Sequence, residues 1–349
     1  MNILALDLGK YKTVFCNYNS TNGEHEFGKV RTTPQEIHDL IVEKEPQKIV
    51  LEVCHIAGWI VDIAKPLGIE TEVANTSHEA WRWKNVKKKN DREDAIKLAK
   101  LSAMNQLPTV HIPEKKVREK RALIKYRQRL VRHRVSIKNA IRAIFAREGI
   151  TMATGKGTWS KEGLQRLKGH AKPLEEIADA NQLWRGQLHV ELEVFEAVTE
   201  SLKKVENKLD KLGACDEKFK RLQTIGGVGP RLAETVVAFL DDPKSFKNSK
   251  QVGSYAGLAP RQYQSGQMDR QGKTGGRGNK LLRNLLVEIC WMSLRCNPWA
   301  RDTYNRLLRG SPSRRKIAII ALARKLVVRC WVMLRDEQDW KNDIQKNVA

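Results

Sequence analysis

The first hundred residues alternate between apolar, β-rich segments and amphipathic segments, and this alternation limits the fold more than any other feature. β-Branched and aromatic residues predict strands in "NILALDLGKYKTVFCNYN", which a glycine turn divides, in "KIVLEVC" and in "IETEVA". Helical periodicity appears in "TPQEIHDLIVEK", "GWIVDIAKPLG" and "DREDAIKLAKLSAM". Strands that alternate with helices build a sheet with covered faces. Residues 1–112 are therefore expected to form an α/β domain.

Residues 113–213 have a different texture, which predicts long helices. The segment "EKKVREKRALIKYRQRLVRHRVSIKNAIRAIFAREG" is strongly basic and has a single apolar stripe. Further along, apolar residues recur every seven positions in two series, Phe195, Leu202, Leu209 and Val198, Val205, Leu212. This heptad seam fits a dimerising coiled coil, and it fits equally well a helical hairpin formed with the basic helix.

Residues 214–349 are expected to be mainly helical, with Trp291, Trp299 and Trp331 in the core. The stretch "RLQTIGGVGPRLAETVVAFL" resembles a helix-hairpin-helix motif, in which Gly227 and Gly229 would bring backbone N–H groups up to a phosphate. A plain corner between two helices explains the same glycines.

The charge of the chain indicates a polyanionic partner. The sequence holds 64 Lys and Arg against 40 Asp and Glu, a formal net charge of +24. Nucleic acid is the leading candidate to neutralise such an excess. A membrane is not expected, because no apolar run reaches the roughly 18 residues of a spanning helix. The scattered cysteines and the absence of a basic segment before an apolar one predict a cytoplasmic protein without a zinc or disulfide framework.

Four carboxylates could form a metal site. Asp7 and Glu52 lie within apolar strand segments, while Asp91 and Asp94 are three residues apart at a helix start and share one face. A turn cap or a helix dipole could explain the aspartates one by one. Together, acids from two strands and one helix would suit Mg²⁺ or Mn²⁺, and two such ions could clamp the attacking and leaving oxygens of a phosphodiester.

The stretch "RQYQSGQMDRQGKTGGRGNK" raises a question about Ser265, which could be a turn residue or a nucleophile. A serine hydroxyl needs a base or a metal to activate it, and the acidic residues upstream are the available suppliers. The glycines of this stretch, at 272, 275, 276 and 278, predict a loop that is mobile or that another segment approaches closely. Cations able to neutralise phosphate charge surround it: Arg261, Arg270, Arg277, Lys280 and Arg283.

The order of these motifs resembles the DEDD transposases of insertion sequences, a family that includes the Piv-type DNA invertases. The resemblance rests on Asp7, Glu52 and Asp91-x-x-Asp94, followed by "YAGLAPRQYQSGQMDRQGKTGGRGNKLLRNLL". It implies an RNase H-like (RuvC-like) α/β domain with a Mg²⁺-binding acidic quartet, followed by a transposase domain.

The same resemblance implies a mechanism and partners. Ser265 would attack a DNA phosphodiester to give a 5′-phosphoserine link, with the acidic site of a partner subunit completing the centre. A structured guide RNA would pair with donor and target DNA, and the protein would act as a dimer or as a tetramer on DNA.

Other basic residues are candidates for binding nucleic acid. Lys84, Lys87, Lys88 and Lys89 alternate with Trp81 and Trp83 just before the aspartate pair, where an indole could stack on a base. A solvated loop is the alternative. The basic helix adds Arg127, Arg129, Arg132, Arg134 and Arg142.

Two other functions compete with the serine recombinase. A two-metal nuclease such as a junction resolvase would use water as the nucleophile and need the carboxylates alone. A non-catalytic DNA- or RNA-binding protein would need neither the carboxylates nor the serine. The motif around Ser265 argues against the two-metal nuclease. The complete acidic quartet argues against the non-catalytic binding protein.

Overall fold

The computed structural model describes residues 1–76, 90–155, 157–266 and 268–341. The chain divides into two compact units, Met1–Arg118 and Glu119–Ala349. Lys84, Lys87, Lys88 and Lys89, predicted to bind nucleic acid, lie outside the described residues. The finer division of the second unit at residue 213 stays a prediction.

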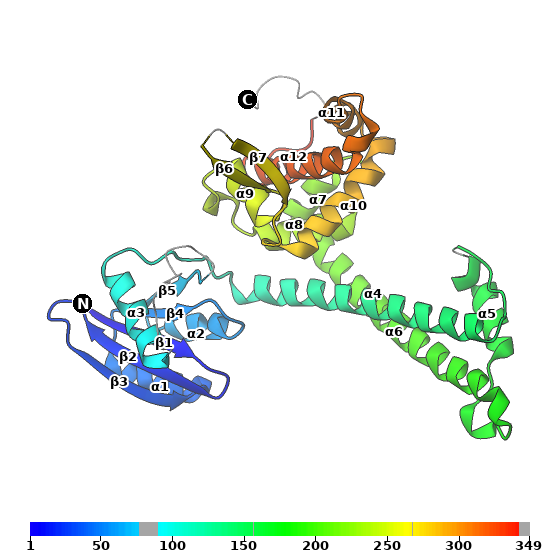
Figure 1. Cartoon of the computed structure of the whole chain (residues 1–349). Helices are drawn as coiled ribbons and strands as arrows, with labels where there is room; N and C mark the ends of the chain where they lie inside the picture. Colours follow the sequence, from blue (N-terminus) through cyan, green and yellow to red (C-terminus); the bar gives the residue numbers. More distant parts are fainter. Residues whose placement is uncertain (77–89, 156, 267, 342–349) are drawn as a thin grey trace. The chain divides into compact units, whose positions relative to one another are not determined.

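The first unit is an α/β sheet covered on both faces, as the alternation predicted (Figure 1). Its five strands are ordered β3-β2-β1-β4-β5, with β2 and β3 antiparallel to their neighbours and β4 and β5 parallel to β1. The elements are β1 (Asn2–Leu8), β2 (Lys12–Asn19), β3 (His25–Arg31), α1 (Pro34–Lys44), β4 (Lys48–Glu52), α2 (Ala57–Ala64), β5 (Glu70–Ala74) and α3 (Asp91–Ala103).

Alternate residues of the sheet serve two separate cores, because successive side chains of a strand point to opposite faces. Leu4 and Leu6 of β1 pack with the apolar faces of α1 and α2. Ile3 and Ala5 of the same strand pack with Ala95, Leu98 and Ala99 of α3. The helices α1 and α2 therefore cover one face and α3 covers the other.

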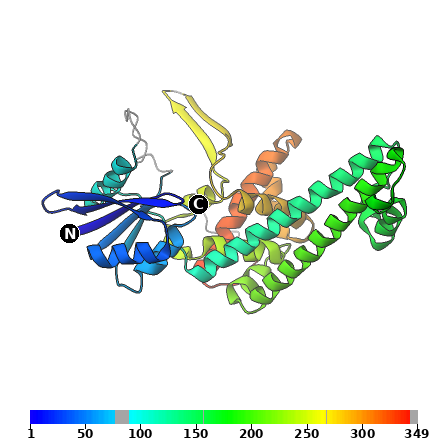
Figure 2. The same cartoon turned by 90° about the horizontal axis from the view of Figure 1, so that it is seen from below.

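The second unit begins with a long helical hairpin, in which α4 (Lys115–Arg147) and α6 (Leu183–Ala214) run side by side in both views (Figures 1 and 2). The first turn of α4 falls at the boundary between the units. Leu130, Ile137 and Ile141 of α4 bury the predicted seam residues Phe195 and Leu202 within the chain. The hairpin interpretation of the heptads is therefore the one that the structure shows. Short elements join the two helices: η2 (Gly157–Trp159), α5 (Lys161–His170), η3 (Leu174–Glu176) and η4 (Ala180–Gln182).

The rest of the second unit is a helical bundle with one projecting β-hairpin, β6 (Pro260–Ser265) and β7 (Met268–Thr274) (Figure 2). The bundle consists of α7 (Glu217–Gln223), α8 (Pro230–Leu240), η5 (Pro243–Ser245), α9 (Ser249–Tyr255), α10 (Lys280–Cys296), α11 (Pro298–Leu308), η6 (Pro312–Arg314) and α12 (Arg315–Arg335). Among the described residues, no helix is long and apolar enough to cross a membrane.

Two local expectations need correction. Gly272 lies inside strand β7 rather than in a loop, and a Cβ there would meet the Tyr263 ring at 2.8 Å. Trp331 is buried, with its indole N–H donating to the Pro243 carbonyl at 2.7 Å, but Trp291 is 43% exposed. The apolar character of tryptophan predicted a core position for Trp291, whereas the bundle leaves this face of α10 open to solvent.

Candidate active site

The parallel pairing of β1 and β4 places Asp7 next to Glu52. In the register of these strands Leu6 lies opposite Leu51, and each acid is the next residue of its strand. Asp7 follows the alternation of Ile3 and Ala5, and Glu52 follows Val50, so both acids belong to the face of the sheet that α3 covers. Both are partly exposed, which leaves this end of the sheet accessible.

Helix α3 contributes the two aspartates from the same side of the sheet. The helix begins at Asp91, and its first turn is capped by the Asn90 side chain, which accepts the Arg92 backbone N–H at 3.2 Å. Ala95 and Leu98 face the sheet, and each lies one helical turn after an aspartate. Asp91 and Asp94 therefore extend the sheet-facing side of α3 toward its amino end. Their negative charge there also complements the helix dipole, which is a structural reason for the same pair.

Lys97 connects the helix and the sheet electrostatically. Burial lowers the pKa of its ammonium, and the carboxylates of Asp94 and Glu52 oppose that shift. One cation therefore senses an acid from α3 and an acid from β4, which is evidence that these two lie near each other. The sequence pattern did not single out Lys97, although its position three residues after Asp94 on the same helix is a usable signal.

The donor set is of the right chemistry for a hard divalent cation, because carboxylate oxygens are the ligands that Mg²⁺ and Mn²⁺ prefer. Within the described ranges, however, no group of three or more His, Cys, Asp or Glu side chains is arranged to hold a metal ion. The backbone brings Asp7, Glu52, Asp91 and Asp94 to one face, and their convergence on a metal stays a prediction.

Ser265 is the last residue of β6, in the second unit. It pairs with Met268 across the hairpin, and Gly266 follows it with φ of +55°. Its side chain is exposed, like most of the strand that carries it. The turn interpretation is therefore correct as local structure, and the same position leaves the hydroxyl accessible to a large substrate. Nearby, the Gln262 amide donates to the Asp269 carboxylate at 3.2 Å across the two strands.

The base of the β6–β7 hairpin is fixed to the bundle. The Arg283 guanidinium of α10 donates to the carbonyls of Gly257 and Gly275, at 3.2 and 3.1 Å. Gly278, with φ of +89°, approaches so closely that a Cβ there would lie 2.5 Å from the Gly257 nitrogen. Arg283, predicted to contact nucleic acid, thus has at least one structural role. Arg261, Arg270, Arg277 and Lys280 are exposed on or beside the hairpin.

Packing within the protein accounts for one of the two glycines at the corner between α7 and α8. A Cβ on Gly227 would lie 2.5 Å from the Ser293 hydroxyl of α10, and the residue has φ of +90°. Gly229 caps α8 and has open space around it. The close approach at Gly227 is therefore to α10, while contact of either glycine with a phosphate stays a prediction.

The basic helix α4 has two kinds of arginine. The Arg127 guanidinium is half-buried and pairs with Glu206 of α6 at 2.6 Å, which stabilises the helical hairpin. Arg129, Arg132 and Arg142 are exposed, and Arg134 is partly exposed. The exposed members remain candidates for nucleic-acid contacts.

Comparison with protein families assigns both units to transposases. A model of the DEDD transposases of the IS110 type matches residues 4–148, and the model described as "Transposase IS116/IS110/IS902 family" matches residues 219–305. The two matched segments contain all four acids and Ser265. The class of protein is thus a transposase, an enzyme class that acts on DNA. Within that class the chain belongs to the IS110 family of DEDD transposases.

Individual relatives agree with this assignment. A probable family 20 transposase of Pseudomonas aeruginosa is 26% identical over 349 residues, which cover 97% of this chain and 98% of the relative. The transposase for insertion sequence element IS1111A of Coxiella burnetii is 27% identical, covering 98% of this chain and 92% of the relative. A pilin gene-inverting protein of Moraxella lacunata is 31% identical over 127 residues, covering 36% of this chain and 39% of the relative.

Proposed function

We propose that this transposase cleaves and rejoins DNA through a covalent link to Ser265, at a composite centre completed by Asp7, Glu52, Asp91 and Asp94. The observation that carries the proposal is the exposure of Ser265 at the end of a projecting strand, where a DNA backbone can reach it. The placement of the acids on one face of the sheet supports the second half of the centre. The strand order and the position of the acids also support an RNase H-like sheet.

The reaction is a balanced transesterification. The Ser265 hydroxyl oxygen attacks the phosphorus, its proton leaves, and a bond to a 5′-phosphate forms while the bond to the neighbouring 3′ oxygen breaks. A proton supplied to that oxygen gives a free 3′-OH. Attack of another strand's 3′-OH on the phosphoserine reverses the chemistry and restores the serine. Mg²⁺ or Mn²⁺ held by the four acids would stabilise negative charge on the attacking and leaving oxygens.

The binding of nucleic acid would be shared by several basic surfaces. Arg261 and Arg270 lie on the hairpin that carries the serine, Arg277 and Lys280 lie just after its base, and exposed arginines of α4 would hold backbone phosphates further away. Gly229 at the start of α8 would contribute its backbone N–H to a phosphate. The net charge of +24 is large enough to serve donor DNA, target DNA and a structured guide RNA. The protein would work in the cytoplasm, as a dimer or as a tetramer on DNA.

A denaturing gel with labelled DNA and Mg²⁺ tests the proposal. Wild-type protein should give a covalent protein–DNA adduct, and Ser265→Ala should give none. Ser313→Ala, which removes another exposed serine of the same unit, is the matched control and should form the adduct normally. Cleavage that survives Ser265→Ala would instead establish a nuclease that uses water, and DNA binding without any cleavage would establish a non-catalytic protein.

Sequencing of RNA purified together with the protein tests the guide. One structured RNA species should be enriched. Random host fragments would contradict RNA guidance and leave the serine chemistry unaffected.

A further inference from the structure

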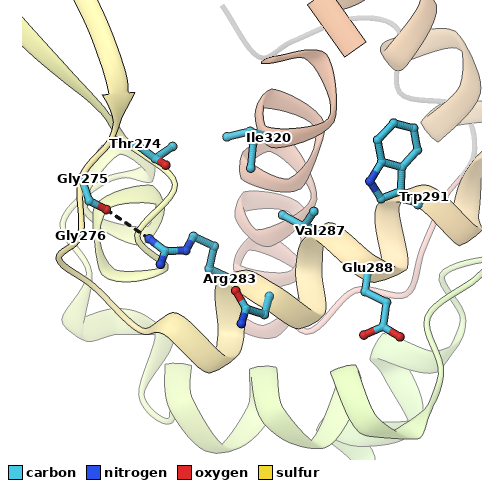
Figure 3. Close-up of a pocket in the computed structure, with 9 residues that line it drawn as sticks. Thr274, Gly275, Gly276, Arg283, Val287, Glu288, Trp291 and Ile320 are labelled. Carbon is cyan, nitrogen blue, oxygen red and sulfur yellow. Dashed lines mark hydrogen bonds between the residues drawn. The ribbon is translucent and has the colours of Figure 1, made fainter. Parts of the chain in front are cut away.

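A pocket of about 640 Å³ opens at the base of the serine-bearing hairpin, between α10, α12 and the end of β7. Figure 3 shows Val287 of α10 and Ile320 of α12 on facing walls, with the Trp291 indole further along α10. Thr274 and Gly275 close the end nearest the hairpin, where Arg283 donates to the Gly275 carbonyl. The pocket is therefore built from the segments that hold the hairpin in place.

The side chains of α10 form a continuous stripe along this pocket. Asn284, Glu288 and Trp291 recur at intervals of four and three residues, so they lie on one face of the helix. All three are exposed, and the Trp291 ring contacts Tyr304 edge to face, with a centroid distance of 6.0 Å that fixes its orientation. An exposed indole that is held by a neighbouring ring offers a rigid, flat stacking surface.

Charge changes sign along the stripe. Arg277, Lys280 and Arg283 lie at the end near the hairpin, and Glu288 lies at the other end, three residues before Trp291 on α10. A phosphate is attracted to the first end and repelled from the second. The ligand that fits this arrangement has an anionic group at one end and an uncharged, flat, hydrogen-bonding group at the other, which describes a nucleotide.

We propose that this pocket holds an unpaired nucleobase of the DNA strand bound at the β6–β7 hairpin. The base stacks on Trp291 between the apolar walls of Val287 and Ile320, and its phosphate lies toward Lys280 and Arg283. The inference rests on the proposed function, because it takes the strand at Ser265 as the source of the base. Enzymes that act on DNA often remove a base from the stack, and an aromatic platform recovers part of the stacking energy that this step costs.

The polar residues of the pocket select among bases. A Glu288 carboxylate only accepts hydrogen bonds, so it favours the exocyclic amine of cytosine or adenine over the carbonyl edge of thymine. The Asn284 amide can both donate and accept, which suits adenine in particular. The pocket is therefore expected to bind adenine and cytosine more tightly than thymine.

Fluorescence anisotropy with two labelled duplexes tests the inference. One duplex carries a single bulged adenine, and the other carries an abasic residue at the same bulge. Wild-type protein should bind the adenine duplex about 5-fold to 150-fold more tightly, the range expected for one base stacked on an aromatic ring. Trp291→Ala should abolish this preference, and Trp291→Phe should retain most of it because a ring remains.

Met292→Ala is the matched control, since Met292 is 58% exposed on the same helix but does not line the pocket. It should leave the preference unchanged. Glu288→Gln should reduce the advantage of a bulged cytosine over a bulged thymine. Equal affinity of wild-type protein for the adenine and abasic duplexes would overturn the inference, as would a preference that survives Trp291→Ala.

The failure of this inference and that of the proposed function are distinguishable. The bulge preference should persist in Ser265→Ala, because that variant retains the pocket. A normal covalent adduct without any bulge preference would refute the pocket alone. A bulge preference without any adduct would refute the serine mechanism alone.

Discussion

The two halves of the proposed centre are supported in very different ways. Strand β1, which carries Asp7, is paired on both sides, and Ile3 through Leu6 are fully buried. Strand β6, which carries Ser265, pairs only with β7 among the described residues, and nearly all of it is exposed. The acids are held by a packed core, whereas the serine is held by the β6–β7 hairpin, a two-stranded arm that is anchored to the bundle at its base. The proposed centre therefore requires the β6–β7 hairpin to meet the acidic face of its own chain or of a partner subunit.

The largest effect should come from mixing two inactive variants. Ser265→Ala should give no adduct because the nucleophile is absent. Asp7→Asn should reduce adduct formation more than about a hundredfold, because charge stabilisation in phosphoryl transfer contributes several kcal/mol. If the acids act from a partner subunit, an equal mixture of the two variants should recover roughly a quarter of the wild-type active centres. Half of the randomly formed dimers contain one copy of each variant, and one of the two centres in such a dimer has both an intact serine and intact acids. The measurement is adduct yield on a denaturing gel. A mixture as inactive as its components would show that each serine uses the acids of its own chain.

The pH dependence of stability should distinguish a structural acid from the proposed catalytic ones. Glu234 of α8 is buried, and burial raises its pKa to about 7, although Arg231, Arg127 and Lys120 act in the opposite direction. The folded protein therefore holds this proton more tightly than the unfolded chain, whose carboxyl has the ordinary value of 4.5. The free energy of unfolding should fall as pH rises between these two values, by about 3 kcal/mol in total.

Denaturant unfolding of the wild type and of Glu234→Gln at pH 5 and pH 8 measures this effect. The variant cannot titrate at that position, so its stability should depend less on pH. Glu217→Gln, on an exposed side chain that pairs with Lys220, is the control and should behave as the wild type. Parallel pH profiles for the wild type and Glu234→Gln would mean that Glu234 is ionised throughout.

A smaller effect is expected at the anchor of the arm. Gly278→Ala forces a Cβ against the backbone of Gly257 at a positive φ, which should destabilise the second unit by roughly 1–3 kcal/mol. Gly276→Ala meets open space and should be nearly neutral. Thermal melting gives the stability, and limited proteolysis within residues 260–276 reports on the arm. Equal melting temperatures and equal proteolysis of the two variants would show that the attachment of the hairpin does not depend on the contact between Gly278 and Gly257.

Local patterns were enough to predict the elements and the order of the chemical groups. The alternation of strands and helices predicted the covered sheet, and the position of Asp7 and Glu52 within apolar strands predicted acids at a sheet edge. Those patterns depend only on neighbours along the chain. The predictions that were wrong, the core position of Trp291 and the loop around Gly272, depended on which surfaces other segments cover. Glu234 was not predicted for the same reason, because its burial depends on other helices. Lys97 follows Asp94 on the same helix, but its proximity to Glu52 of β4 depends on the tertiary structure.

By itself, the sequence determined that this chain carries an α/β sheet with acids at the ends of its strands, a strongly basic surface and a serine among glycines and cations. Only the tertiary structure decided that the heptads of α6 pack on α4 within the chain, that Ser265 ends an exposed strand, and that Trp291 faces solvent in the pocket at the base of that hairpin. The physical reason is that hydrogen bonding and side-chain periodicity act over a few residues, whereas burial depends on contacts between segments far apart in the sequence.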